Sequence, residues 1–323
     1  MYVLGIDGGG TKTNGVVADE NGNVFMQTVT SRSNPNTLSK AEFEKVMSDL
    51  ILELKTQKPD IFEEVTVCFA GMAGVGESGR DVELTNLLKK YLPTKTQVFV
   101  NHDAINALYS GTLGAPGIVQ IAGTGSITFG MNEVDKTARS GGWGYLFDDE
   151  GSGFYMGNEA LRAVFQDFDG RGTATDLTDL VLQHFTVSYV PDIIGQVYGH
   201  EHPRSAIAPL SKYVVEAAVA NDEVAKNIIL KACESMVSCI QSCHRQLFEE
   251  NHQTIIVLSG SVFTNAQLFI QLLNEFTSEA MPNVEFRQTQ VSPVGGAVVA
   301  GLLSQNLELG KHFAKQMNEQ MQN

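Results

Sequence analysis

The fold of this chain is decided by Val3-Leu4-Gly5-Ile6-Asp7-Gly8-Gly9-Gly10-Thr11-Lys12-Thr13, followed by the apolar run 15–18. It predicts a strand that ends at Asp7, a tight turn and a second strand. Three glycines without Cβ atoms let the turn take positive φ and approach a ligand closely. Successive N–H groups in such a turn form an anion-binding concavity, and Thr11 and Thr13 add hydroxyl donors. We therefore predict phosphate contacts at Gly9, Gly10, Thr11 and Lys12, with Asp7 holding a hydrated Mg²⁺ beside them.

Two better-known phosphate motifs do not fit this stretch. A Walker A loop has Gly, four residues, then Gly-Lys-Ser/Thr, and counting from Gly5 puts Thr11 where lysine is required. The Rossmann G-x-G-x-x-G turn opens a helix, whereas the β-branched run after Thr13 predicts a strand. A glycine-rich hairpin with a hydrogen-bonded Asp7 and no ligand is the alternative interpretation, although hairpin turns rarely need three glycines.

The composition indicates a soluble globular protein of two domains. The chain has 323 residues, 43% of them hydrophobic, which is enough for two cores. No apolar run approaches the length of a membrane span, and the N-terminus enters a strand at once, so we expect no span and no signal peptide. The net charge of −15 opposes binding to nucleic acid or to an anionic membrane, but not to ATP. The four cysteines, at 68, 233, 239 and 243, are expected to be reduced thiols.

The opening pattern recurs about 115 residues later in the chain. After a predicted domain joint at 114–117, an apolar strand leads into Gly123-Thr124-Gly125-Ser126 and a further strand at 127–130. We predict a second phosphate turn here, with Thr124 and Gly125 as contacts. Two such turns imply duplicated cores that grip opposite sides of one nucleotide.

Two polar segments follow predicted strands. Asp103 comes at the carboxyl end of a short strand, where open α/β folds place their ligands; a helix N-cap is the alternative role. The loop from Ser31 to Asn36 offers side-chain amides to a ligand, or it forms a plain proline turn.

Three later segments are rich in glycine. The loop 141–153 contains the single Trp of the chain and the acids at 148–150, suited to sugar hydroxyls, to a metal or to solvent. Ser259-Gly260-Ser261 makes a strand-to-helix turn suited to an adenosine face. Gly295-Gly296 lies at the start of a helix of small residues, which we expect to form a hinge between the domains.

Together, the blocks at 5–13, 101–103, 122–126, 141–152 and 259–263 resemble the actin-like ATPase superfamily of sugar kinases and seventy-kilodalton chaperones. Within it, residues 1 to about 305 resemble the N-acetylglucosamine kinase group, related to the BadF/BadG/BcrA/BcrD-type ATPases. The resemblance implies an α/β fold of two RNase H-like domains with a ligand cleft between them. The N-terminal domain would comprise residues 1–115 and a C-terminal helix at about 305–323, and the larger domain residues 116–304 with a helical insertion.

The resemblance also implies a role for each matching residue. Asp103 would be the catalytic base that faces the sugar 6-hydroxyl. Asn34 or Asn36 would hold sugar hydroxyls, and the register across Pro35 leaves the choice open. At Asp148 some relatives have glycine, and the extra charge here bears on sugar preference. The other implied contacts are Ser126, Gly142, Trp143 and Asp149 for the sugar, Thr11 and Thr124 for the ATP phosphates, Gly260 and Ser261 for adenosine, and Asp7 for Mg²⁺.

The implied activity is ATP-dependent phosphorylation of N-acetyl-D-glucosamine at its 6-hydroxyl, by a cytoplasmic homodimer that serves amino-sugar metabolism and cell-wall recycling. N-acetylmuramic acid is a further implied substrate, but its carboxylate calls for a cation that the sequence does not place. A glucosamine kinase is one alternative. Another is a BadF-type ATPase that activates a dehydratase, which needs cysteines for an iron–sulfur cluster, and no Cys lies between 69 and 232.

Overall fold

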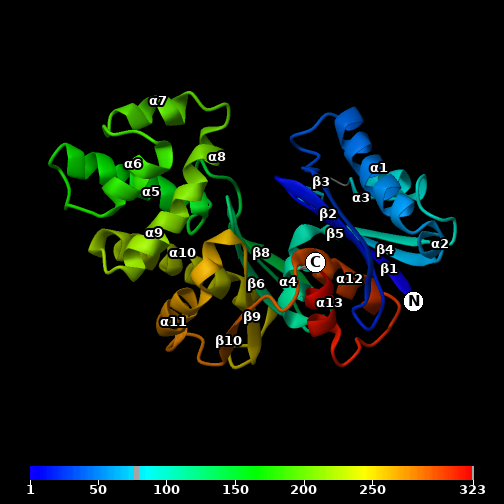
Figure 1. Ribbon diagram of the computed structural model, residues 1–323. Coiled ribbons are helices and arrows are strands. Elements are labelled where there is room, and N and C mark those ends of the chain that lie inside the picture. Colours follow the sequence, from blue (N-terminus) through cyan, green and yellow to red (C-terminus); the bar gives the residue numbers. More distant parts are fainter. Residues whose placement is uncertain (76–79, 322–323) are drawn as a thin grey trace. The chain divides into compact units, whose positions relative to one another are not determined.

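The computed structural model describes residues 1–75 and 80–321 of the chain (Figure 1). The chain divides into two compact units, which are described separately below. Unit 1 consists of Met1–Ala115 and Thr289–Asn323, and unit 2 of Pro116–Gln288. The sequence-based assignment of residues 289–304 to the second domain is therefore wrong. This segment contains helix α12 (Pro293–Leu303), whose apolar side chains pack against the strands of unit 1.

Unit 1 is built on a mixed five-stranded sheet in the order β3-β2-β1-β4-β5. The first three strands along the chain form an antiparallel meander, and the last two run parallel to β1. The carboxyl ends of β1, β4 and β5 consequently meet at one edge, where Asp7, Gly71 and Asn101 are aligned in register. The strands are β1 (Tyr2–Gly8), β2 (Lys12–Ala18), β3 (Val24–Ser31), β4 (Val65–Met72) and β5 (Gln97–His102).

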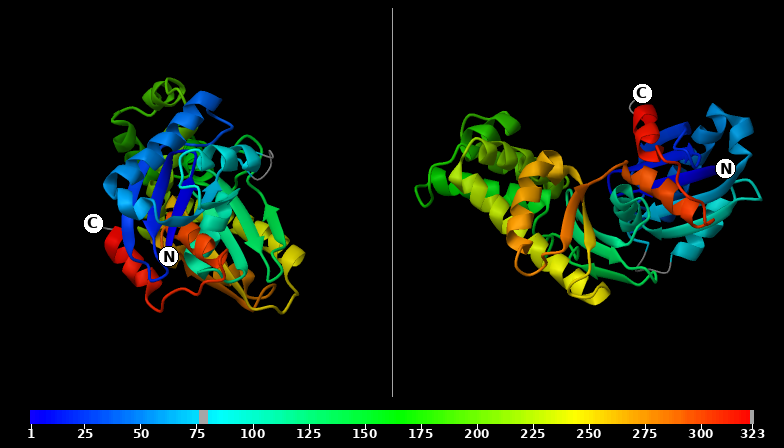
Figure 2. Two further views of the ribbon diagram at one scale, coloured as in Figure 1. Left: turned by 90° about the vertical axis from the view of Figure 1, so that its right-hand side faces the viewer. Right: turned by 90° about the horizontal axis from the view of Figure 1, so that it is seen from below.

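Helices cover both faces of the unit 1 sheet (Figures 1 and 2). Successive residues of β1 alternate between the faces: Leu4 packs with the core under α1 and α3, whereas Val3 packs with α12 and α13. Both faces are buried, so the strand reads as a nearly continuous apolar run. The helices are α1 (Lys40–Gln57), α2 (Pro59–Phe62), α3 (Asp81–Lys89), α4 (Asp103–Thr112), α12 and α13 (Phe313–Met321).

The glycine pair in α12 packs the helix closely against α4 and is not a hinge. Gly295 and Gly296 are both buried inside the helix. A Cβ on Gly296 would lie 1.9 Å from the carbonyl oxygen of Asn106 in α4. The pair also lies within unit 1, away from the chain crossings at 115–116 and 288–289. The prediction of a hinge at this pair is therefore wrong, and its small residues serve close helix packing.

Unit 2 repeats the strand arrangement of unit 1. Its sheet has the order β10-β9-β6-β7-β8, with β6, β7 and β8 antiparallel in sequence and β9 and β10 parallel to β6. The predicted duplication of an α/β core is thus confirmed. The short edge strand β8 was not predicted, because four residues are too few to establish an alternating pattern. The strands are β6 (Gly117–Ala122), β7 (Ser126–Met131), β8 (Thr137–Ser140), β9 (Thr254–Ser259) and β10 (Val284–Gln288).

A long helical segment lies between β8 and β9 of unit 2. Its longest helix, α10, runs along the sheet and packs on β7 and β8 (Figure 2). After β9 the chain forms a short 3-10 turn, η2 (Ser261–Asn265), and helix α11 (Ala266–Thr277). The inserted helices are α5 (Gly153–Phe168), α6 (Leu177–Phe185), α7 (Asp192–Tyr198), α8 (Pro203–Ile207), the 3-10 turn η1 (Ala208–Leu210), α9 (Ser211–Val219) and α10 (Glu223–Leu247).

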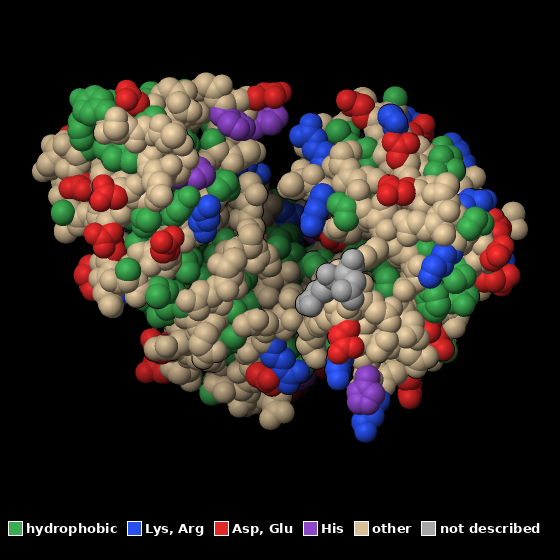
Figure 3. All heavy atoms as spheres, viewed as in Figure 1, with side chains coloured by type: hydrophobic (Ala, Val, Ile, Leu, Met, Phe, Trp, Pro, Cys, Tyr) green, Lys and Arg blue, Asp and Glu red, His purple; other side chains and the backbone are tan. Residues whose placement is uncertain are grey.

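The surface is typical of an acidic protein. On the face seen in Figure 3, the Lys and Arg side chains are scattered among Asp and Glu. Within residues 1–75 and 80–321, no helix combines the length and hydrophobicity that crossing a bilayer requires. Of the four cysteines, all free thiols, only Cys239 is partly exposed.

Candidate active site

The first glycine turn joins β1 to β2 at the edge where the strands of unit 1 end. Side chains pack directly on Gly8, where a Cβ would lie 2.3 Å from the Met72 sulfur and 2.6 Å from the Ser33 hydroxyl oxygen. Gly10 has open space around its Cβ position, and Thr11 and Lys12 are exposed, so a ligand can approach the turn closely. None of Gly8, Gly9 and Gly10 has positive φ, so the turn does not use the left-handed backbone that three glycines permit. Thr13 is buried and donates to the Ser31 carbonyl, which removes it as a ligand contact.

Asp7 is the carboxylate beside this turn. Burial raises the pKa of Asp7 to about 6 from its ordinary 3.8, and the nearby Asp103 carboxylate adds to the rise. A hydrogen bond of 2.9 Å from Asn106 Nδ2, a hydrogen bond from Asn14 and the charge of Lys12 oppose it. Burial is the largest cause of the raised pKa, so the charged form of Asp7 is unfavourable in the folded chain.

The oxygen donors at this edge fit a hydrated Mg²⁺. Carboxylates are the hard ligands that Mg²⁺ prefers, and the ion usually keeps several waters, so one or two carboxylates suffice. Asp7 supplies one carboxylate, and the charge of Asp103 lies close enough to raise the pKa of Asp7. In the described parts of the chain, no cluster of three or more His, Cys, Asp or Glu side chains forms a metal site, so a cation here would remain mostly hydrated.

Asp103 is the first residue of α4, and its carboxylate does not cap the helix. The N-cap is His102, whose Nδ1 lies 3.1 Å from the Ala104 nitrogen and 2.9 Å from Asp103 Oδ1. This nitrogen accepts from the Ala104 N–H when it is unprotonated, and it donates to the Asp103 carboxylate when it is protonated. The N-cap alternative for Asp103 is therefore wrong, and 28% of its side chain is exposed at the end of β5. Such a carboxylate can accept a proton from a bound hydroxyl.

The Asn34–Asn36 loop packs between the first glycine turn and the end of β4. The Ser33 N–H donates to the Gly9 carbonyl at 3.1 Å, which ties the loop to the turn. Asn34 Oδ1 accepts from the Asn36 N–H at 2.9 Å, forming an Asx turn. Both amides lie against Gly74, which has positive φ and leaves space for them. Both candidate asparagines therefore lie in the same small region of unit 1.

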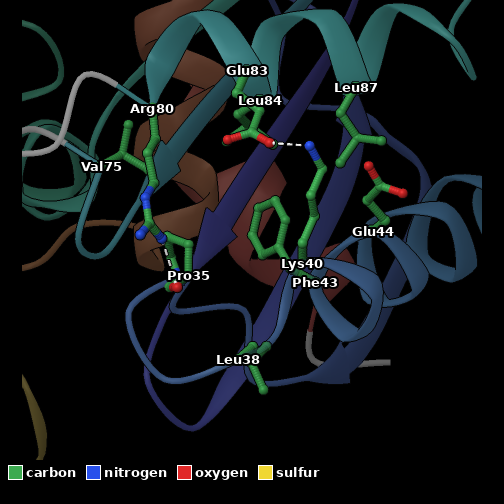
Figure 4. A pocket seen from close by; sticks show the side chains of 10 residues that line it. All are labelled: Pro35, Leu38, Lys40, Phe43, Glu44, Val75, Arg80, Glu83, Leu84 and Leu87. Atoms are coloured by element: carbon green, nitrogen blue, oxygen red, sulfur yellow. Dashed lines mark hydrogen bonds and ion pairs between the residues drawn. The ribbon is translucent and has the colours of Figure 1, made fainter.

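An arginine from α3's N-terminal end supports this loop from behind. Arg80 Nη1 donates to the Pro35 carbonyl at 2.6 Å, as Figure 4 shows. The two side chains are at one end of a largely apolar pocket of about 220 Å³ between α1 and α3. The Lys40–Glu83 ion pair of 2.7 Å bridges the same two helices. The pocket thus lies next to the loop. The loop itself is held by the Ser33–Gly9 hydrogen bond and by the Arg80–Pro35 hydrogen bond.

The second glycine turn, between β6 and β7, lies beside the Gly260 turn. Gly260 has φ of 113°, and a Cβ there would lie 2.3 Å from the Ala122 carbonyl oxygen. Thr124 is exposed, and the Ser261 hydroxyl oxygen lies close to the Cβ position of Gly123. The structure therefore brings the predicted phosphate contacts of unit 2 next to the predicted adenosine contacts.

The aromatic loop between β8 and α5 is held by its own acids and by Arg139. Gly141 and Gly142 both have positive φ, and their carbonyls accept from Arg139 at 3.1 and 2.6 Å. The Arg139 guanidinium lies 4.1 Å from the ring centre of Trp143. The backbone N–H of Trp143 donates to Asp148 Oδ2 at 2.8 Å. Asp148 thus shapes the loop, and Trp143 is held in place with 60% of its surface exposed.

Asp149 is a buried carboxylate with positive φ, which marks it as a constrained residue. Burial raises its pKa, and Arg204 from α8 opposes that rise. Arg204 Nη2 lies 3.0 Å from Asp149 Oδ2, and both groups press on Gly125, where a Cβ would collide with them. The inserted helix α8 therefore places the positively charged Arg204 side chain beside the second glycine turn.

Ser126, the first residue of β7, is linked to a buried polar side chain. Gln120 Nε2 donates to Ser126 Oγ at 2.9 Å. The backbone N–H of Ser126 is bonded to Asp149, which lowers the pKa of that carboxyl. Ser126, Gly142 and Asp149 thus line one small region of unit 2, and Trp143 directly follows Gly142 in the chain.

The candidate residues form two sets, one in each unit. The sequence analysis missed several polar side chains that support them. Asn106 was recognisable, because it lies one helical turn after Asp103. Arg204 was not, since 55 residues separate it from its partner Asp149. The missed residues are Arg80, His102, Asn106, Gln120, Thr128, Arg139 and Arg204.

Comparison with known proteins identifies the family. The chain is 30% identical to an N-acetylmuramic acid/N-acetylglucosamine kinase of Clostridium acetobutylicum over 92% of this chain and 97% of that protein. It is 33% identical to an N-acetyl-D-glucosamine kinase of Dictyostelium discoideum over 93% of this chain and 98% of that protein.

Solved structures of sugar kinases share the fold. A candidate N-acetylglucosamine kinase of Porphyromonas gingivalis has a TM-score of 0.72 at 19% identity, covering 95% of this chain and 100% of that one. A ROK family glucokinase of Streptomyces griseus has a TM-score of 0.59 at 16% identity, again with 95% and 100% covered. The sequence profile of one family matches residues 4–302. The chain belongs to the BadF/BadG/BcrA/BcrD ATPase family.

Proposed function

We propose that this protein is an ATP-dependent amino-sugar kinase that phosphorylates N-acetyl-D-glucosamine on its 6-hydroxyl. The single observation that carries the proposal is Asp103, a partly exposed carboxylate that is relieved of capping by His102 and lies near the Asp7 carboxylate. The names of the two full-length relatives support the same class of substrate.

In unit 1, Asp103 would orient the sugar hydroxyl and accept its proton as O6 attacks the γ-phosphorus and ADP leaves. The open backbone at Gly9 and Gly10, with Thr11 and Lys12, would receive phosphate oxygens. Asp7 would hold Mg²⁺, which when bound neutralises charge on the phosphates. Asn34 and Asn36 would offer amides to the sugar hydroxyls, held in place by the contacts to Gly9 and Arg80.

In unit 2, the exposed face of Trp143 would stack on the sugar ring, while Ser126, Gly142 and Asp149 would contact the acetamido group and neighbouring hydroxyls. Thr124 and Gly125 would contact phosphates, and Gly260 and Ser261 the adenosine. The proposal requires both residue sets to act on the same pair of substrates.

N-acetylmuramic acid is a second candidate substrate, favoured by the position of Arg204. The lactyl carboxylate of that sugar calls for a cation close to the acetamido subsite. The guanidinium of Arg204 contacts Asp149, and 32% of the arginine side chain is exposed. Arg204→Met should therefore reduce kcat/KM for N-acetylmuramic acid more than for N-acetylglucosamine. Equal losses on the two sugars would remove the carboxylate contact from the proposal.

The test of the main proposal is a coupled ADP-release assay with five sugars: N-acetylglucosamine, N-acetylmuramic acid, glucosamine, N-acetylmannosamine and glucose. Mass spectrometry and NMR of the product locate the phosphate. We expect the highest kcat/KM with N-acetylglucosamine and a 6-phosphate product. Faster turnover of glucose, or of glucosamine, would overturn the specificity. ATP hydrolysis without any phosphorylated sugar would instead favour the dehydratase-activating class.

The catalytic role of Asp103 is tested with a matched pair of variants. Asp103→Asn should fold, bind ATP and lose about 10²–10⁴-fold in kcat, because the amide cannot accept the proton. Asp81 is an exposed aspartate at the same position of another helix, the first residue of α3. Asp81→Asn therefore controls for the loss of a charge at a helix N-terminus and should keep full activity. Near-normal turnover by Asp103→Asn would exclude Asp103 as the base.

We further propose that the protein acts as a cytoplasmic homodimer in amino-sugar metabolism, including cell-wall recycling. Analytical ultracentrifugation of the purified protein measures its assembly state. A monomer at micromolar concentration would contradict the dimer without affecting the kinase proposal.

A further inference from the structure

We propose that Gln120 is a positioning residue that fixes the Ser126 hydroxyl as a hydrogen-bond donor and so favours N-acetylated sugars over free amines. The inference rests on the proposed amino-sugar kinase function, and it identifies what in unit 2 selects the substituent on the sugar. It concerns two side chains, Gln120 and Thr128, that lie behind the sugar contacts and touch no substrate themselves.

The side chains of Thr128, Gln120 and Ser126 form a chain of hydrogen bonds across β6 and β7. Thr128 Oγ1 donates to Gln120 Oε1, and Gln120 Nε2 donates to Ser126 Oγ at 2.9 Å. Gln120 and Thr128 are 1% and 0% exposed, so no solvent competes for these bonds. Burying polar groups destabilises the folded protein unless they are hydrogen-bonded. Here the Thr128 hydroxyl orients the Gln120 amide, and the amide in turn orients the Ser126 hydroxyl.

The direction of the chain is fixed by a backbone carbonyl. Gln120 Nε2 also donates to the Ile121 carbonyl at 3.2 Å. A carbonyl can only accept, so the amide group that faces it must be the NH₂ group and not the oxygen. The amide oxygen then faces Thr128, which must donate. Both N–H bonds of Gln120 are therefore in use, one at Ile121 and the other at Ser126.

These bonds determine which hydrogen-bonding role the Ser126 hydroxyl can play toward a ligand. One of its lone pairs is occupied by Gln120, and its own proton has no acceptor among residues 1–75 and 80–321. Ser126, at the start of β7, is only 8% exposed. Its hydroxyl therefore offers a ligand at this subsite its O–H donor and one remaining lone pair. An acetamido carbonyl accepts such a bond, whereas a protonated amine has three donors and no acceptor.

Arg204 reinforces the same preference. The Asp149 carboxylate would otherwise attract a sugar ammonium group, but it is paired with the Arg204 guanidinium at 3.0 Å and with the Ser126 backbone N–H. An ammonium group at this subsite would meet a donor hydroxyl and a neutralised carboxylate. With a free amine as substrate, the Ser126 O–H would be buried without an acceptor. The binding free energy lost in this way is larger than that of one missing contact, and this would make the site selective for the N-acetylated sugar.

The experiment measures kcat/KM for N-acetylglucosamine and glucosamine with the full-length protein, at a pH where the amine is protonated. The variants are Ser126→Ala, Gln120→Met, Thr128→Val and the double variant Ser126→Ala/Gln120→Met. The quantity compared is the ratio of the two kcat/KM values. Thr96→Val in unit 1 is the matched control, because Thr96 is also a buried threonine whose hydroxyl donates, in its case to the Val65 carbonyl.

We expect Gln120→Met and Thr128→Val each to lower the N-acetylglucosamine/glucosamine ratio by about 3- to 10-fold, the effect of one neutral hydrogen bond. The double variant should show no larger change than Ser126→Ala alone, because Gln120 acts through that hydroxyl. Thr96→Val should leave the ratio unchanged.

An unchanged ratio in Gln120→Met and Thr128→Val, in protein that still turns over N-acetylglucosamine, would overturn the inference and leave the kinase proposal intact. So would an additive loss in the double variant, since it would mean that Gln120 acts independently of Ser126. Absence of turnover with every amino sugar in the unmodified protein would refute the proposed function itself. If Gln120→Met does not fold, as judged by its thermal unfolding, Thr128→Val alone decides between these outcomes.

Discussion

Replacing Asp7 by asparagine should stabilise the metal-free protein at neutral and alkaline pH, although it removes the proposed Mg²⁺ ligand. The reason is that ionisation of the buried Asp7 carboxyl lowers the stability of the folded chain. Burial and the neighbouring Asp103 carboxylate raise its pKa to about 6, and the hydrogen bonds from Asn106 and Asn14 only partly compensate. The residue is thus unfavourable for the folded chain without a cation, which is typical of a site built for a ligand.

The sign and size of the effect follow from proton linkage. The folded-state pKa of about 6 lies above the ordinary 3.8, so the folded chain binds this proton more tightly than the unfolded chain. The stability that this proton contributes is fully present below the unfolded pKa and is lost as the pH rises through the folded one. The carboxylate therefore costs about 3 kcal/mol at pH 8 and about 1 kcal/mol at pH 4.5. These figures are upper values for Asp7→Asn, because asparagine keeps a single acceptor oxygen.

The assay must report on unit 1 alone, because a chain with two compact units can unfold in two steps. Cys68 provides the probe: it is fully buried in β4, whereas the other three cysteines lie in α10 of unit 2. Pulsed thiol labelling across a urea series, with peptide mass spectrometry of the Cys68 peptide, gives the free energy of unfolding of unit 1. The measurement is made in EDTA at several pH values.

The expected result is that Asp7→Asn is more stable than the unmodified protein at pH 8 and that the gain shrinks towards pH 4.5. Asp60→Asn is the control, because Asp60 is an exposed aspartate of unit 1, in the first turn of α2. The pH-dependent gain expected for Asp7→Asn should be absent from this variant. A pH-independent gain for Asp7→Asn, or a loss at pH 8, would refute the reasoning about the Asp7 carboxylate. Added Mg²⁺ and nucleotide should stabilise the unmodified protein but not the Asp7→Asn variant.

Three further outcomes are expected. Gly296→Ala should destabilise unit 1 by about 1–3 kcal/mol, because its Cβ would lie 1.9 Å from the Asn106 carbonyl oxygen; Gly195→Ala, in a helix with no atom nearby, should be neutral or stabilising, and equal melting temperatures would contradict the close-packing account. Arg204→Met should move the acidic limb of the kcat/KM profile for N-acetylglucosamine to higher pH, because the arginine holds down the raised pKa of Asp149; an unmoved limb would exclude that coupling. Chelation of Mg²⁺ by EDTA should abolish turnover and be reversed by added Mg²⁺, whereas undiminished activity would exclude the metal.

Much of the fold could be predicted from the sequence because it is written in local patterns. The apolar runs on both sides of the turn at 8–12, and their recurrence at 118–130, predict two strand pairs whichever way the chain folds further. The same local chemistry marked Asp7, Asp103 and the glycine turns as candidates, since each follows directly on a strand. The edge strand β8 escaped prediction because its four residues form no pattern.

The roles of single residues could not be predicted from the sequence, because they depend on contacts between distant segments. Gly8 packs directly against the Met72 side chain and does not have positive φ, and the Thr13 hydroxyl donates to the Ser31 carbonyl of the neighbouring strand. The capping of α4 by His102, which leaves the Asp103 carboxylate free of that role, depends on side-chain geometry that the letters Asn-His-Asp do not specify.

Sequence by itself therefore determined the duplicated α/β framework and the positions of the chemistry-bearing turns, since hydrophobic periodicity and glycine runs act locally. Only the tertiary structure decided which polar groups support those turns. Asn106 reaches Asp7 across 99 residues, and Arg204 reaches Asp149 across 55. Such partners are chosen by packing and by the need to pair every buried charge and polar group, a condition that becomes visible only when the chain is folded.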